Sequence, residues 1–305
     1  MTEQQIHRPV DDDTLAALRD FTTSVGSTLG YPAVGDRVWR DHAATPADSA
    51  IVTATDDDAL VGVLHLGAAD ADGVVTGSLV VAPSSRGRGV ESDLVQVALG
   101  DLRGGGCVRL EYWVFGDAGD ADSPSGPPVR ALHEMRVTIP LTGADAAPAW
   151  PEGTRVRPFE PGADDDAWLA VNDRAFAHDP DQGGWTPDVL RQRVAEPWFD
   201  PAGFLLVEDA EGLAGFCWTK VHPPTPPFDP EPVGEIYVIA VDPGRQGTGL
   251  GRALVVAGLE WLAGQGITTG MLFVDAGNAP AVALYEALGF VATRTDRLFA
   301  RAVGG

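Results

Sequence analysis

The chain has 305 residues, about twice the length of an average domain, so two domains are expected. Apolar residues make up 44% of it, enough for sizeable cores, which excludes a wholly disordered protein. With 21 basic and 44 acidic residues the formal net charge is −23, which argues against a protein that binds nucleic acid or an anionic membrane.

The first residues, MTEQQIHRPVDDD, are polar and acidic and lack the pattern of a signal peptide. No apolar run approaches the roughly 20 residues of a membrane helix. Two cysteines cannot form a disulfide framework, so the predicted location is a reducing cytoplasm. We expect the protein to be a monomer. Lys220 is the only lysine, so backbone dipoles and arginines would have to hold an anionic ligand.

An internal repeat with an offset of 160 residues runs through the chain. The segment LVVAPSSRGRGV at 79–90 matches IAVDPGRQGTGL at 239–250. Two long units of this kind indicate a tandem duplication rather than a solenoid. A stretch that contains several prolines separates the two units. We therefore predict an N-terminal domain at 1–140, a linker at 141–153 and a C-terminal domain at 154–305.

Strands and helices alternate along the second unit, which predicts an α/β (α+β) class. The predicted strands are 155–157, 204–208, 213–220, 235–241, 271–274 and 298–303. The predicted helices are 167–176, 187–196, 252–263 and 279–288. Two Pro- and Gly-rich loops, 116–128 and 222–234, are expected to shape the rims of sites.

A glycine-rich turn, QGTGLGR at 246–252, follows a predicted strand and opens a helix. Its glycines let a ligand approach the backbone, and the first amides of the helix can bind phosphate without lysines. The spacing fits neither the dinucleotide fingerprint nor a P-loop. Taken alone, the glycines also fit a plain turn.

The turn and its surroundings carry a family resemblance. VDP at 241–243 followed by Q-x-x-G-x-G at 246–251 resembles the pyrophosphate-binding signature of the GCN5-related N-acetyltransferases. N-x-x-A-x-x-L-Y-x-x-x-G-F at 278–290 resembles their second landmark. The resemblance implies two tandem domains of that fold, each a mixed, mostly antiparallel sheet flanked by helices. It also implies acetyl-CoA as co-substrate and no metal.

A narrower resemblance lies in the runs DQGGW at 181–185, WFDP at 198–201, WTKVH at 218–222 and GEIYV at 234–238. These runs are similar to those of the mycothiol synthases, a two-domain branch of the family. Members of that branch acetylate the cysteinyl amine of desacetylmycothiol, and the resemblance implies the same acceptor here.

The resemblance implies an acetyl-CoA site in which one strand contacts the pantetheine arm and the glycine turn holds the pyrophosphate. Its residues would be Ile239, Ala240, Val241, Gln246, Gly247, Thr248, Gly249, Leu250, Gly251, Arg252, Asn278 and Ala281. Tyr285 lies one helical turn beyond Ala281 on the same face, placed to protonate the leaving thiolate. A core position is the alternative for this tyrosine.

Glu235 is the candidate general base. It lies in a strand of apolar residues, on one face with Tyr237 and Ile239, where burial in a cleft would make it a stronger base. A carboxylate on a solvated strand edge is the alternative. The resemblance implies that Asp36, Asp181, Lys220, Glu235 and Phe273 contact the acceptor, with Phe273 replacing an aromatic alcohol. We expect Cys217 to be a buried apolar residue.

The first domain keeps the turn RGRG at 86–89 but has Glu91 where a small residue is expected, and this carboxylate would repel a pyrophosphate. It also lacks the second landmark. We expect it to be non-catalytic, to supply Asp36 to the acceptor, and to offer at most an additional CoA site at Leu79, Val80 and Val81.

Two other functions remain open on the residues alone. The acceptor could be another small amine, an aminoglycoside or a polyamine, which an acidic chain would also suit. The chain could instead be a CoA-binding sensor without turnover, although the presence of both Glu235 and Tyr285 argues against this.

Overall fold

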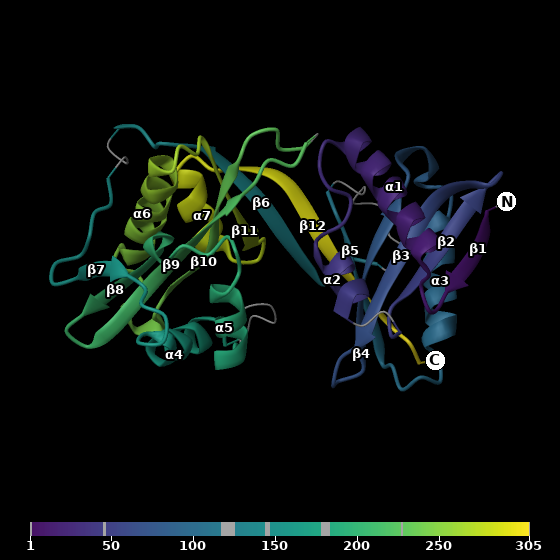
Figure 1. The fold of residues 1–305 in the computed structure, drawn as a ribbon, viewed down its shortest axis with the longest axis horizontal. Helices are drawn as coiled ribbons and strands as arrows, with labels where there is room; N and C mark the ends of the chain where they lie inside the picture. Colours follow the sequence, from purple (N-terminus) through teal and green to yellow (C-terminus); the bar gives the residue numbers. More distant parts are fainter. Residues whose placement is uncertain are drawn as a thin grey trace. The chain divides into compact units, whose positions relative to one another are not determined.

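The computed structural model describes residues 2–44, 47–116, 126–143, 147–177, 184–226 and 228–304. Its contacts divide the chain into two compact units (Figure 1). Unit 1 consists of Met1–Glu134, Asp275–Asn278 and Thr293–Gly305, and unit 2 of Met135–Val274 and Ala279–Ala292. Two strands, β6 (Arg130–Thr138) and β12 (Val291–Ala302), therefore contribute residues to both units. The boundaries expected from the sequence stay a prediction.

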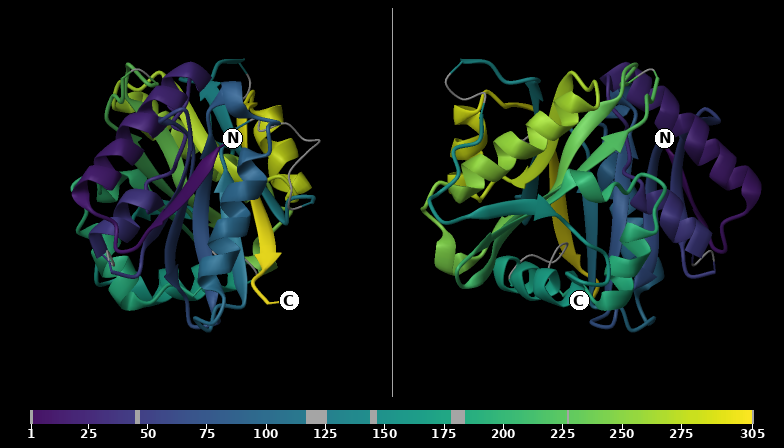
Figure 2. Two further views of the ribbon diagram at one scale, coloured as in Figure 1. Left: turned by 90° about the vertical axis from the view of Figure 1, so that its right-hand side faces the viewer. Right: turned by 60° about the vertical axis from the view of Figure 1, so that its left-hand side comes forward.

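Unit 1 is a mixed sheet with helices on both faces (Figures 1 and 2). Its strands lie in the order β1-β2-β3-β4-β5-β12, and all pair antiparallel except β4 and β5. Apolar residues of α1 and α2 fill the core on one face and those of α3 on the other. The elements are β1 (Glu3–His7), α1 (Asp12–Leu29), α2 (Arg37–Ala44), β2 (Ala50–Asp56), β3 (Ala59–Ala69), β4 (Val74–Val81), η1 (Pro83–Ser85), α3 (Val90–Leu102) and β5 (Arg109–Val114).

Unit 2 repeats this architecture, with strands in the order β6-β11-β10-β9-β8-β7. Each of the strands β7, β8 and β9 pairs antiparallel with the next strand along the chain, whereas β10 and β11 are parallel. Its elements are β7 (Arg155–Pro158), α4 (Asp165–Ala175), α5 (Pro187–Val194), η3 (Pro201–Gly203), β8 (Phe204–Asp209), β9 (Gly212–His222), β10 (Val233–Val241), η4 (Pro243–Arg245), α6 (Leu250–Gly264), β11 (Thr269–Asp275) and α7 (Ala279–Ala287). The predicted class and the two similar mixed sheets are confirmed.

Two apolar clusters cover the faces of the second sheet. On one face, α6 and α7 pack with Cys217, Ile236 and Ile267. On the other, α4 and α5 pack with aromatic residues of β8 and β9, among them Phe204 and Trp218, whose rings stack 4.4 Å apart. Cys217 is fully buried, as expected, and burial raises the pKa of its thiol.

The predicted elements of the second half are all present, with ends shifted by a few residues, but the last strand differs in length and place. It begins at Val291, and its residues Arg297–Ala302 pair antiparallel with Arg109–Val114 of β5, inside unit 1. The loop 116–128 lies mostly outside the described residues. Within the described ranges, no helix is both long and apolar enough to cross a bilayer.

Candidate active site

The two parallel strands of unit 2 diverge soon after they meet. Their register covers only Gly234 with Gly270 and Glu235 with Met271, although the strands continue to Val241 and Asp275. In unit 1 the equivalent pairing continues to Ser78 and ends directly before Leu79. Ile239, Ala240 and Val241 thus lie on the part of β10 that is not in register with β11. A strand edge of this kind can offer backbone groups to an extended ligand.

A bulge in β10 decides which side chains share the face of Glu235. The register with β9 shifts between Ile236 and Val238, and Glu235 lies opposite Lys220. Beyond the bulge, Tyr237 packs with the α4 and α5 cluster, whereas Ile239 packs with the α6 cluster. The expectation that Glu235, Tyr237 and Ile239 share one face is therefore wrong, because the extra residue of a bulge interrupts strict alternation.

Glu235 is buried, with 8% of its surface exposed, so the alternative of a solvated carboxylate does not hold. Its Oε2 lies 2.7 Å from Nε2 of His222, the last residue of β9. Lys220 also faces this side of the sheet, with its Nζ 4.8 Å from the ring centre of Trp198 and 5.5 Å from that of Tyr237. Glu235, His222 and Lys220 therefore lie, together with the aromatic rings, on the face of the sheet that packs against α4 and α5.

Sequence reasoning did not single out His222. One signal was available, because His222 and Lys220 are two residues apart on a strand and must share a face. The sequence does not reveal the register between β9 and β10, which places Glu235 opposite Lys220 and Val233 opposite His222. Without this register, His222 cannot be assigned to the surroundings of Glu235.

Tyr285 lies in α7 on the opposite face, since it packs in the same cluster as Ile236, the neighbour of Glu235. It is 7% exposed, and its ring centre lies 5.7 Å from that of Phe290. Burial, together with the nearby Cys217, raises the pKa of Tyr285 to about 12. The phenol is therefore protonated at neutral pH and can donate a hydrogen bond. Tyr285 is a core residue as well as a candidate acid.

The glycine turn between β10 and α6 has the backbone of an anion site. Gly247 and Gly249 have φ of +78° and +87°, and a Cβ at either would meet nothing within 4 Å. Gly249 is the N-cap of α6 and has no capping side chain. The first-turn amides of the helix, from Leu250 onward, can therefore face a phosphate.

Ion pairs fix this turn to the rest of unit 2. Asp242 accepts hydrogen bonds from Arg174 at 2.6 Å and from Arg245 at 3.2 Å, and Arg245 also pairs with Asp209. Burial raises the pKa of Asp242, but the hydrogen bonds from Arg174, Gly244 N–H and Arg245 outweigh it and leave the pKa below its usual value. Because these arginines are paired with carboxylates, a phosphate here would depend mainly on backbone amides.

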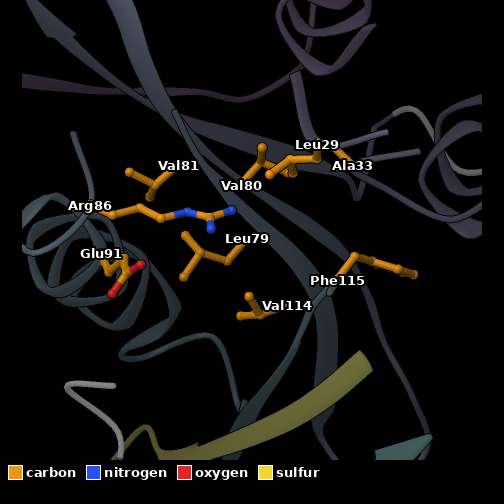
Figure 3. A pocket seen from close by; sticks show the side chains of 9 residues that line it. All are labelled: Leu29, Ala33, Leu79, Val80, Val81, Arg86, Glu91, Val114 and Phe115. Carbon is orange, nitrogen blue, oxygen red and sulfur yellow. The ribbon is translucent and has the colours of Figure 1, made fainter. Parts of the chain in front are cut away.

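Unit 1 has an equivalent glycine turn before α3, but different side chains surround it. Gly87 and Gly89 have φ of +71° and +88°, close to their counterparts in unit 2. Glu91 stands in the first turn of α3, and burial raises the pKa of its carboxyl, while Arg86 acts in the opposite direction. Both side chains line a narrow pocket (Figure 3) whose other residues are Leu29, Ala33, Leu79, Val80, Val81, Val114 and Phe115. The additional CoA site at 79–81 stays a prediction.

The other predicted residues are spread over the two units. Asp36 is exposed directly before α2 in unit 1, and Phe273 is 42% exposed in β11. Asn278 precedes α7, and Ala281 lies in its first turn. Asp181 lies outside the described residues. Among the residues that the structure does describe, no cluster of three His, Cys, Asp or Glu side chains could hold a metal.

Comparison with solved structures supports the fold of the whole chain. A GCN5-related N-acetyltransferase from Sphaerobacter thermophilus superposes with a TM-score of 0.72 at 22% identity, covering 99% of this chain and 96% of that one. A tandem GNAT protein from the clavulanic acid biosynthesis pathway superposes with a TM-score of 0.67 at 19% identity, covering 100% and 99%.

Sequence comparison finds nearer relatives. The mycothiol acetyltransferase of Thermobispora bispora is 46% identical over 260 residues, covering 84% of this chain and 85% of that protein. The mycothiol acetyltransferase of Streptomyces coelicolor is 43% identical over 300 residues, covering 95% and 92%. The acetyltransferase (GNAT) family model matches twice, at residues 15–123 and 168–290. The chain therefore belongs to the acetyltransferase (GNAT) family.

Proposed function

We propose that the protein transfers the acetyl group of acetyl-CoA to the cysteinyl amine of desacetylmycothiol. The observation that carries the proposal is the buried Glu235, flanked by His222 and Lys220, at the point where β10 and β11 separate. Relatives named mycothiol acetyltransferase, at 40–46% identity over most of the chain, support this acceptor.

The residues present fit acetyl-CoA as the co-substrate. The uncapped start of α6 and the open space at Gly247 and Gly249 suit a pyrophosphate. Gln246, Thr248, Gly251 and Arg252 complete this turn. Ile239, Ala240 and Val241 would hold the pantetheine amides, and Asn278 and Ala281 would contact the arm from the start of α7. Bound there, acetyl-CoA supplies an activated acyl group.

Glu235 and Tyr285 would handle the protons of the reaction. Glu235 accepts a proton from the attacking amine, whose pKa as a free α-amine is about 7.7–8.0, so part of the acceptor is already deprotonated at neutral pH. Tyr285 donates a hydrogen bond or its proton to the departing sulfur. Because the two lie on opposite faces of the sheet, the acceptor and the thiol would approach from opposite sides of the separation between β10 and β11.

The remaining roles are parts of the same proposal. Asp36, Asp181, Lys220 and Phe273 would contact the acceptor, and the N-terminal domain would be non-catalytic. The protein would be a cytoplasmic monomer, to which the acidic charge and the two unpaired cysteines are suited.

A thiol-release assay with acetyl-CoA and a panel of amines tests the proposal. We expect desacetylmycothiol to react at least about a hundredfold faster than polyamines or aminoglycosides at equal concentration. This factor corresponds to about 2.7 kcal/mol, within reach of two charge-assisted contacts. Equal rates on all amines would overturn the acceptor assignment, and the absence of thiol release with every amine would overturn acetyl transfer itself.

A further inference from the structure

His222 makes the hydrogen bond that orients the carboxylate of the base. Its Nε2 lies 2.7 Å from Oε2 of Glu235, and the two side chains are 32% and 10% exposed. We propose that His222 is a positioning residue, which holds Oε2 so that Oε1 is left to take the proton of the acceptor amine. This inference rests on the proposed function, because it concerns the same site.

A buried carboxylate needs such a partner to present one oxygen reliably. The terminal torsion of a glutamate side chain has a broad preference, so its two oxygens are not fixed by the rotamer alone. The β9–β10 register fixes the backbone of both partners, since His222 pairs with Val233 and Glu235 with Lys220. A single hydrogen bond across this register is enough to select one orientation of the carboxylate.

The direction of the hydrogen bond follows from the protonation states. An ionised carboxylate only accepts, so the nitrogen of His222 that faces it must carry a hydrogen. When Oε1 takes the amine proton, Glu235 becomes a neutral acid, and Oε2 still accepts from Nε2–H. His222 keeps its proton throughout. A glutamine amide, which donates but does not titrate, can therefore take its place.

The other charged groups around this pair are already engaged or face solvent. The ammonium of Lys220 lies over the rings of Trp198 and Tyr237. In the loop after His222, Asp229 is paired with Arg136, and Glu231 is exposed. Lys220 and Tyr237 are the other titratable side chains placed by the two strands on this face.

A double-mutant cycle tests the positioning role. The variants are His222→Gln, His222→Leu, Glu235→Gln and the pair His222→Leu with Glu235→Gln. Loss of a hydrogen bond to a charged group predicts that His222→Leu lowers kcat by about 10- to 100-fold, with the KM for acetyl-CoA unchanged. His222→Gln should retain kcat within about threefold. In the Glu235→Gln background, His222→Leu should have no further effect, because there is no base left to orient.

Two measurements separate positioning from a general loss of structure. His133→Leu is the matched control, because His133 is also partly buried and bonded to a side chain, Thr295, but lies in unit 1. Its kcat should stay within about twofold. In the protein without substrates, a low-field imidazole N–H proton resonance should disappear in His222→Gln and move in Glu235→Gln.

The outcomes distinguish this inference from the function it rests on. Three results together support a positioning role for His222. His222→Leu lowers kcat, His222→Gln keeps kcat near that of the unsubstituted protein, and His222→Leu has no further effect on kcat in the Glu235→Gln background. Wild-type kcat in His222→Leu, or equal losses in both backgrounds, would overturn the role of His222 while leaving acetyl transfer in place. Absence of transfer by the unsubstituted protein would overturn both.

Discussion

Replacing Tyr285 with phenylalanine measures how a buried phenol assists the departure of a thiol. The pKa of about 12 places Tyr285 roughly 3.5 units above an ordinary thiol of about 8.5, so full proton transfer to a free thiolate is uphill by about 4.8 kcal/mol. Tyr285 should therefore stabilise the sulfur chiefly as a hydrogen-bond donor. Such a bond to a charged group contributes about 1.5–3 kcal/mol, which predicts a fall in kcat of about 10- to 150-fold in Tyr285→Phe.

The assay is thiol release from acetyl-CoA with desacetylmycothiol, measured between about pH 6.5 and 9.5. The profiles of the variant and the unsubstituted protein should run parallel, because a phenol with a pKa near 12 stays protonated over this whole range. The KM for acetyl-CoA should change less than about twofold, since the glycine turn is untouched. Tyr112→Phe, at a fully buried tyrosine of unit 1, is the matched control and should keep kcat.

Two results would refute this reasoning. An alkaline loss of activity between pH 8 and 9.5 that disappears in Tyr285→Phe would mean that the phenol titrates far below 12. An unchanged kcat would mean that the sulfur departs without help from Tyr285.

Four further substitutions test other parts of the molecule. Glu235→Gln should lower kcat by about 10²-fold and move the remaining activity to higher pH, where more acceptor is deprotonated; an unchanged kcat–pH profile would assign the base to another group. Gly251→Glu should weaken acetyl-CoA binding at least about tenfold, and the reciprocal Glu91→Gly should raise the calorimetric stoichiometry from one towards two; two equivalent sites in the unsubstituted protein would contradict this. Hydrogen bonds from Arg157 hold the pKa of Asp164 below its usual value, so their stabilisation is present above about pH 4 and is lost as the pH falls through the folded-state pKa. Asp164→Asn should flatten this acid loss in unfolding followed by circular dichroism.

Features that depend on neighbouring residues could be predicted from the sequence. The turns at Gly89 and Gly249 are examples, because glycine spacing and the following helix are local signals, and their N-cap angles agree within a few degrees. The burial of Cys217 and the strands around it likewise follow from apolar patterning.

Features that depend on pairing between distant segments could not be predicted from the sequence. Strict alternation would place Glu235 and Ile239 on one face, but the bulge at Tyr237 interrupts it. No residue type in that strand predicts the bulge. The bond between His222 and Glu235 needs the β9–β10 register. Local propensity also does not reveal that β12 pairs with β5, since many strands could occupy that edge.

The pairing of Arg297–Ala302 with β5 also has a consequence for biogenesis. At about 5–20 residues per second, the ribosome needs roughly 10 to 40 seconds to make the stretch of about 180 residues between these partners. During that time the edge of β5 has no native strand beside it, and open edges invite pairing with other chains. A fragment ending near residue 140 would keep that edge permanently open, so it should associate or misfold where the longer chain does not. The net charge of −23 makes copies of the chain repel one another. This repulsion would limit association through the open edge of β5 before β12 has been synthesised.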